Sequence, residues 1–216
     1  MKKLTAHWLM LCTLLFTMTS CTRAEQPSTE REEPSTEESD SLQGKKILIV
    51  YLSRTKNTKA VAEIIHKKVG GELVALELVT PYPENYQQIV AQVSKENDEG
   101  YLPPLKTKIE DINQYDVVFL GFPTWGMQLP PPMKSFLNQY DLKEKMVVPF
   151  NTNAGYGIGS SFETVKKLCP ESRILEGFST KGGVERDGIL YVMEGEKETE
   201  VQAEVQNWLK KLGLVN

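Results

Sequence analysis

The sequence predicts one α/β domain, a doubly wound parallel sheet of five strands with helices on both faces. Apolar runs alternate with amphipathic stretches throughout residues 45–216, which is the pattern of repeated strand–helix units. The runs are continuous, as in parallel strands that are covered on both faces. Three of the loops that follow these runs are rich in small polar, glycine or aromatic residues. A segment of this length is sufficient for a single hydrophobic core.

The first predicted strand and helix carry the clearest patterns. Ile47–Leu52 is an unbroken apolar run rich in β-branched residues, so neither side of this strand is expected to meet water. After a short polar turn, apolar residues recur at helical spacing between Val61 and Val69. The sequence therefore predicts a strand, a polar turn and a helix in direct succession.

The remaining predicted elements alternate in the same way. Further strands are predicted at Glu72–Val79, Asp116–Gly121, Met146–Phe150 and Arg173–Phe178. Further helices are predicted at Asn85–Asn97, Pro130–Leu137, Ser160–Leu168 and Lys197–Leu212. The last helix has glutamates near its start and lysines at its end, as the helix dipole favours, and Gly213 fits the position after the C-cap.

The turn after the first strand is rich in hydroxyl and amide side chains. Ser53, Thr55, Asn57 and Thr58 fall within six positions. A helix N-terminus presents unpaired N–H groups and the positive end of its dipole, so this turn suits a phosphate. Helix capping alone explains one or two such residues, but four exceed what capping needs. We interpret the turn as a phosphate site.

Two later loops offer aromatic side chains on a backbone punctuated by Gly and Pro. Residues 121–130 contain Trp125, and residues 151–160 contain Tyr156 between glycines. In doubly wound sheets, ligands bind outside the carboxyl ends of the strands. Either aromatic alone could simply pack its loop. Because both follow strands beside the phosphate turn, we expect a planar, phosphorylated, redox-active ring.

Three segments resemble the FMN-binding loops of the flavodoxin family: YLSRTKNT from Tyr51, GFPTWG from Gly121 and PFNTNAGYG from Pro149. The chain is most similar to bacterial flavodoxin-like proteins with a Trp in the second loop. The resemblance implies the strand order 2-1-3-4-5 and FMN as cofactor. It implies that the cofactor-binding residues are Ser53, Arg54, Thr55, Lys56, Asn57, Thr58, Pro123, Thr124, Trp125, Gly126, Asn153, Gly155, Tyr156 and Gly157.

Lys56 departs from the family pattern, which usually has Gly at this position. If the position requires a positive φ, a residue other than Gly costs about 1–2 kcal/mol. A lysine that reaches the phosphate would offset this with a charge-assisted bond of about 1.5–3 kcal/mol. The two effects are comparable, so we expect FMN binding to survive the substitution.

The N-terminal 44 residues read as an export signal and a tether. Residues 1–20 combine two lysines with an apolar stretch too short to span a bilayer, which is typical of a signal peptide. Small residues precede Cys21, as in the lipobox of bacterial lipoproteins, so Cys21 is the predicted lipidation site. Residues 22–44 contain seven acidic residues and no aromatic, which predicts a disordered tether. We expect a membrane-anchored lipoprotein outside the cytoplasm.

Composition excludes several classes of function. Residues 45–216 carry a net charge of −1, so no nucleic-acid-binding surface is expected. Beyond the predicted lipobox they contain one cysteine, Cys169, and one histidine, His66. This set offers no zinc site and no Ser-His-Asp triad. Flavin chemistry needs no catalytic side chain, because the ring carries the electrons.

Three functions remain open from the sequence. The first is an FMN-binding electron carrier that exchanges electrons with a redox partner protein. The second is an FMN-dependent NAD(P)H/quinone reductase, which the sequence does not separate from the first. The third is a binding lipoprotein that keeps the fold without redox chemistry; Lys56 and the expected location favour it.

Overall fold

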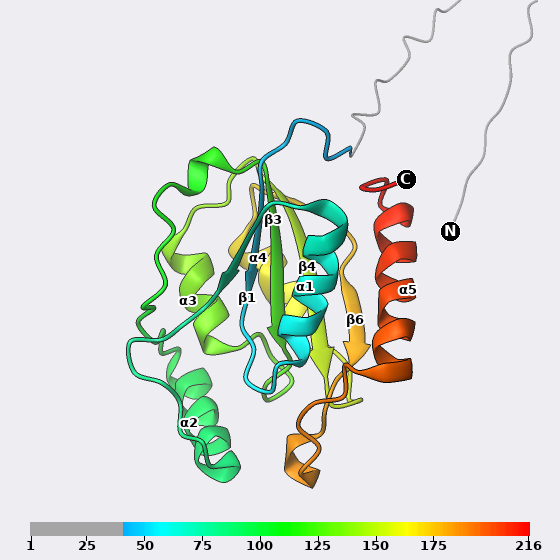
Figure 1. The fold of residues 1–216 in the computed structure, drawn as a ribbon. Helices are drawn as coiled ribbons and strands as arrows, with labels where there is room; N and C mark the ends of the chain where they lie inside the picture. Colours follow the sequence, from blue (N-terminus) through cyan, green and yellow to red (C-terminus); the bar gives the residue numbers. More distant parts are fainter. Residues whose placement is uncertain (1–40) are drawn as a thin grey trace, which may run out of the picture. The chain divides into compact units, whose positions relative to one another are not determined.

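The computed structural model describes residues 41–216, which form a parallel sheet with helices on both faces (Figure 1). The sheet strands are β1 (Ile47–Tyr51), β2 (Glu72–Ala75), β3 (Val117–Pro123), β4 (Met146–Asn153), β5 (Arg173–Ile174) and β6 (Phe178–Lys181). The α-helices are α1 (Asn57–Val69), α2 (Tyr86–Glu99), α3 (Pro131–Gln139), α4 (Ser161–Leu168) and α5 (Gly195–Lys211). The strand order is β2-β1-β3-β4-β5, and β6 also pairs with β4. The predicted fold and strand order are confirmed.

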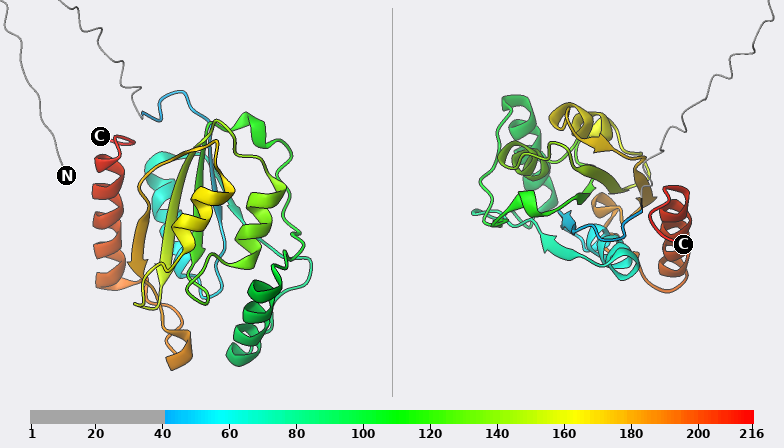
Figure 2. Two further views of the ribbon diagram at one scale, coloured as in Figure 1. Left: turned by 180° about the vertical axis from the view of Figure 1, so that it is seen from behind. Right: turned by 90° about the horizontal axis from the view of Figure 1, so that it is seen from above.

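Each face of the sheet packs against its own helix pair. Alternate residues of β1, β3 and β4 point into two separate cores. Buried residues of α1 and α5 belong to one core, and those of α3 and α4 belong to the other. The view from above in Figure 2 shows the helices on the two sides of the sheet. Because all five β1 residues are buried, the continuous apolar run that predicted this strand has its physical explanation.

The predicted fifth strand is broken into β5 and β6, and Pro149 explains the gap. The carbonyls of Lys145 and Val147 accept bonds from the β5 side, so Pro149 faces the same side two residues later. Proline has no N–H to donate to the ladder. Pairing resumes at Phe150, which lies opposite Phe178. The strand therefore extends three residues beyond its predicted end, to Lys181.

The second strand ends at Ala75, four residues earlier than predicted. The chain then leaves the sheet edge, and Leu78 forms an isolated antiparallel bridge with Leu105. Glu77 is engaged there as well, because its N–H donates to Thr107 Oγ1 at 2.7 Å. The later chain segment thus replaces the sheet as the partner of these residues.

Two helices lie at the end of the sheet where the predicted site is expected. In Figure 1, α2 and the short helix η2 (Glu185–Asp187) lie toward the end of the sheet where the strands terminate.

Leu42, in the predicted tether, packs against the α1/α5 core. The predicted signal peptide, Cys21 and tether residues 22–40 lie outside the described residues. None of the helices within residues 41–216 has both the length and the apolar character of a membrane span.

Candidate functional site

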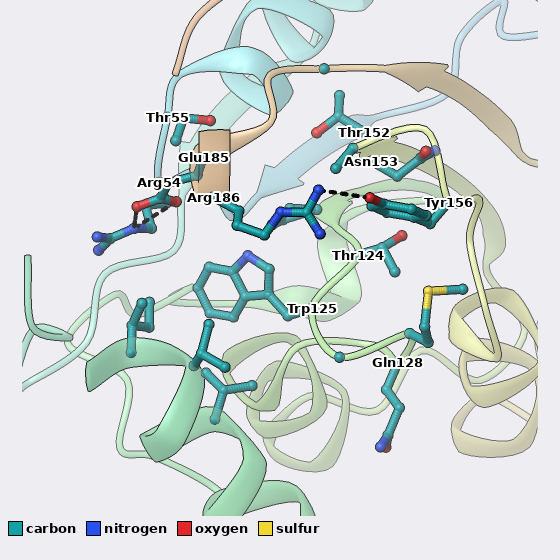
Figure 3. A pocket seen from close by; sticks show the side chains of 18 of the residues that line it. Arg54, Thr55, Thr124, Trp125, Gln128, Thr152, Asn153, Tyr156, Glu185 and Arg186 are labelled. Carbon is teal, nitrogen blue, oxygen red and sulfur yellow. Dashed lines mark hydrogen bonds and ion pairs between the residues drawn. The ribbon is translucent and has the colours of Figure 1, made fainter. Parts of the chain in front are cut away.

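A cavity of about 420 Å³ lies at the carboxyl ends of β1, β3 and β4 (Figure 3). The three loops predicted from the sequence contribute Arg54, Thr55, Asn57, Thr58, Pro123, Thr124, Trp125, Gly126, Asn153, Tyr156 and Gly157 to its lining. Ser53, Lys56 and Gly155, which were also predicted, are not part of the lining. The structure thus brings together eleven of the fourteen predicted residues; that they bind a cofactor stays a prediction.

The first loop keeps its backbone donors free. Within residues 41–216, no hydrogen bond is donated by the main-chain N–H groups of residues 55–58. The donated bonds begin later: the Lys59 N–H donates to the Ser53 hydroxyl Oγ at 3.2 Å, and the first helical bond runs from the Ala60 N–H to the Lys56 carbonyl at 2.9 Å. Four unpaired donors at the N-terminus of a long helix suit an anion.

The side chains of the first loop are mostly engaged within the protein. The buried Asn57 amide donates to Thr55 Oγ1 at 2.8 Å and to the Leu190 carbonyl at 2.6 Å. Its oxygen accepts the Val192 N–H at 3.1 Å. Thr58 Oγ1 lies 2.8 Å from Thr152 Oγ1 in a buried contact. Thr55 differs, because its hydroxyl accepts from Asn57 and keeps its own proton to donate.

Arg54 holds three segments together at one end of the cavity. Its Nε lies 2.8 Å from a Glu185 carboxylate oxygen, and both side chains are about four-fifths buried. Its Nη1 donates to the Pro83 carbonyl at 2.9 Å, and its Nη2 donates to the Glu84 carbonyl. Each nitrogen of the guanidinium is therefore bonded to an acceptor of the protein.

Lys56 occupies the N-cap position of α1 with φ of 67°. The left-handed conformation that we considered for this position is thus observed, with a residue other than Gly. The Lys56 side chain is exposed and does not line the cavity. Lys56 therefore carries the conformational cost of a positive φ, and its side chain is not among the residues that line the cavity.

The second loop turns sharply around Trp125. Trp125 and Gln128 exchange backbone hydrogen bonds, and Gly126 and Met127 between them both have positive φ, as in a type I′ turn. The Trp125 ring packs edge-to-face against Tyr82, with centroids 5.5 Å apart. Behind Trp125, Tyr82 is partly buried: burial raises the pKa of Tyr82, and its bond to the Glu96 carboxylate raises it further. Trp125 thus both lines the cavity and packs against its support.

The third loop is shaped by Asn153. The Asn153 side-chain oxygen accepts the N–H groups of Gly155 at 2.8 Å and Gly157 at 3.1 Å. These two glycine N–H groups are taken up inside the loop, and Tyr156 between them is 64% exposed. The loop therefore presents the Tyr156 side chain to the cavity.

Two walls of the cavity were not predicted from the sequence. Residues 182–191, which we call the strap, follow β6 and contribute Gly182, Gly183, Val184, Glu185 and Arg186. Helix α2 contributes a second wall, with Tyr86, Ile89, Val90, Val93, Ser94, Asn97 and Asp98. The strap could have been found from the sequence, because its two adjacent glycines follow the fifth predicted strand as the unusual residues of the other loops follow theirs. Nothing in the sequence indicated that α2 lines the cavity, because a helix in this fold normally covers a sheet face.

The site accommodates the predicted ligand. Its volume lies within the usual range of small-molecule sites, roughly 300–1,000 Å³. One end offers the four free N–H groups and the Thr55 hydroxyl, which suit a phosphate. Trp125, Tyr156 and the apolar face of α2 offer surfaces for a flat ring.

The fold and the site together define a doubly wound α/β protein whose first loop has free backbone N–H groups at the carboxyl edge of its sheet. Comparison of the sequence with known protein families identifies one family. The sequence model of the flavodoxin family matches residues 46–195, and the chain belongs to this family.

Named relatives and solved structures agree with this assignment. The flavodoxin of Nostoc sp. strain PCC 7120 is 26% identical over 148 residues, covering 67% of this chain and 72% of that protein. A candidate flavoprotein of Bacteroides eggerthii is 30% identical with a TM-score of 0.64, covering 79% of this chain and 99% of that one. A flavoprotein of Lactobacillus acidophilus in complex with FMN has 23% identity and a TM-score of 0.56, covering 67% and 98%. This last likeness is one of fold.

Proposed function

We propose that this chain is an FMN-binding electron-transfer protein that is tethered to a membrane outside the cytoplasm. Membership of the flavodoxin family supports FMN as the cofactor. The observation that carries the proposal is the row of four free backbone N–H groups beside a cavity with aromatic walls. When bound, FMN supplies the redox chemistry, because its ring carries the electrons.

The residues of this chain bind and enclose the cofactor. The N–H groups of residues 55–58 and the Thr55 hydroxyl would hold the phosphate. Pro123, Thr124 and Trp125 would line one side of the ring site, and Tyr156 the other. The apolar face of α2 would exclude water from the same space.

The test is whether the purified full-length chain takes up FMN and prefers it to riboflavin. A yellow protein that releases FMN in acid is expected. In fluorescence titrations, FMN should bind at least about 100-fold more tightly than riboflavin, because the phosphate adds charge-assisted hydrogen bonds of about 1.5–3 kcal/mol each. A colourless protein that cannot be reconstituted would favour the binding lipoprotein without redox chemistry. Equal affinities for the two flavins would contradict the phosphate site.

The tether is a separate part of the proposal. It rests on the lipobox-like residues before Cys21 and on the acidic composition of residues 22–44. Cys21→Ser should release the mature protein from the membrane fraction of cells. A variant that remains membrane-bound would contradict lipidation at Cys21.

We further propose that electrons come from a redox partner protein at the membrane and not from soluble NAD(P)H. The expected location supports this, because the nicotinamide pool is cytoplasmic. Stopped-flow mixing of the FMN-loaded protein with NADH and NADPH, each with and without a quinone, separates the alternatives. Rapid, saturating flavin reduction by either nucleotide would move the protein into the reductase class.

A further inference from the structure

Arg186 of the strap extends across the cavity. Figure 3 shows its side chain reaching from η2 toward Tyr156, on the strap side of the Trp125 ring. Its Nη2 donates to Tyr156 Oη at 3.1 Å, and its Cζ lies 6.0 Å from the centre of that ring. A flat ring that occupies the space between Trp125 and Tyr156 would therefore lie against this guanidinium.

The strap that carries Arg186 is firmly attached. Glu185 pairs with Arg54 of the first loop, and Leu190 accepts from the buried Asn57 amide. The strap also closes on itself, because Ile189 and Val184 form an antiparallel bridge. Gly183 lies inside this closed loop, where a Cβ would meet the Ile189 and Leu190 carbonyl oxygens at 2.4 Å. Arg186 thus projects from a backbone that the first loop holds in place.

The charge of Arg186 is directed at the cavity. Arg54, the other cation in the lining, is paired with Glu185 at 2.8 Å and bonded to two carbonyls. Arg186 has a carboxylate partner as well, Asp187 at 2.9 Å, but Asp187 is half exposed and does not line the cavity. Asp187 holds the Nε edge of the guanidinium and also accepts from Nη2 at 3.5 Å, and Nη2 donates to Tyr156 Oη as well. Because Arg186 lines the cavity and Asp187 does not, the ring site lies nearer the positive end of this pair.

We infer that Arg186 raises the reduction potential of the bound cofactor by placing this positive charge beside the ring. The inference rests on the proposed function. Two electrons from the redox partner protein and one proton from water leave the ring with one negative charge. A cation nearby stabilises this product more than the neutral oxidised ring, most strongly where protein excludes water. Arg186 therefore favours the reduced form of the cofactor.

The test compares the midpoint potential of bound FMN in the full-length protein and in Arg186→Gln, by equilibration with a reference dye. We expect the preference for the reduced cofactor to fall about tenfold, which corresponds to about 30 mV for a two-electron couple. The matched control is Lys181→Gln, which removes a nearby exposed cation that does not line the cavity. Its potential should stay unchanged. Asp187→Asn should shift the potential upward, because it removes the opposing charge.

Further variants separate this role from a structural one. Arg186→Lys keeps the charge and should recover most of the potential, whereas a role in packing alone would not be rescued this way. An unchanged potential in Arg186→Gln, or an equal shift in Lys181→Gln, would overturn the inference. Loss of FMN binding in Arg186→Gln that Arg186→Lys does not restore would do the same. Absence of FMN binding by the unmodified chain would instead contradict the proposed function itself.

Discussion

The first and third loops differ in what their asparagine side chains bond. In the first loop the main-chain N–H groups of residues 55–58 are free, while Asn57 and Thr58 bond within the protein. In the third loop Asn153 takes up the glycine N–H groups, and the Tyr156 side chain projects outward. A polar residue in a binding loop can therefore serve the loop itself and leave the ligand to its neighbours.

This comparison assigns different parts of the FMN molecule to the two loops. Main-chain donors at a helix N-terminus suit the phosphate, whose position they fix. Side chains on a turned loop suit the ring, which has large flat faces. Variants of the first loop should therefore separate FMN from riboflavin, and variants of the third loop should not.

The largest effect is expected for Asn57→Ala. This change removes a buried amide that bonds Thr55, Leu190 and Val192, and it leaves the Leu190 carbonyl and the Val192 N–H without their partner. We expect the free energy of unfolding to fall by about 2–3 kcal/mol. Urea denaturation of the flavin-free protein measures it. A change below 0.5 kcal/mol, roughly that of a neutral surface substitution, would show that the first loop does not depend on the strap.

Thr55→Ala should weaken FMN binding about 10- to 100-fold, because a phosphate oxygen loses one hydroxyl donor. Riboflavin affinity should change little. Thr199→Ala, in the exposed part of α5, serves as a control that removes the same groups far from the cavity. A parallel loss for both flavins would assign Thr55 to loop structure instead.

Asn153→Ala should weaken FMN and riboflavin equally, by about tenfold. The amide oxygen that holds Gly155 and Gly157 is lost, so the third loop no longer presents Tyr156 in a fixed position. Two neutral hydrogen bonds of about 0.5–1.5 kcal/mol each are at stake. Titration with both flavins measures the effect, and a loss confined to FMN would reverse the assignment of the two loops.

The smallest effect is expected for Lys56→Gly. Glycine relieves the positive φ of 67°, at the cost of a more flexible unfolded chain, so stability should rise by at most about 1 kcal/mol. FMN affinity should stay within about threefold, because the Lys56 side chain does not line the cavity. A large loss of affinity would mean that Lys56 reaches the phosphate when the cofactor is bound.

Much of the fold could be predicted because its signals are local. The buried run at Ile47–Tyr51 and the periodic face of α1 directly encode their burial. The break of the fifth strand could not be predicted in this way. Its cause is Pro149 on the neighbouring strand, and the effect of a missing N–H across a ladder becomes visible only when the pairing is known.

The site shows the same limit. The three loops could be found because each carries unusual residues directly after a strand. The sequence did not show that the side chains of Asn57 and Asn153 bond backbone groups of the protein. An asparagine in a loop gives the same sequence pattern whether it faces a ligand or a backbone group. The α2 wall was also missed, since Ile89 and Val93 have the same spacing as any core-facing helix residues.

The turn at Met127 has a consequence for how the cavity opens. Met127 adopts φ of 58°, a strained conformation for a residue other than Gly, and its carbonyl accepts the Ser160 N–H at 3.0 Å. Gly159 beside it leaves no room for a Cβ, which would lie 2.0 Å from that carbonyl. A strained turn releases strain when it opens, which lowers the free energy of separating this part of the wall. Hydrogen exchange at the Gln128 backbone amide should therefore be faster than exchange in β3 and β4. Trp125 would then move away from the cavity while the strands of the sheet remain paired.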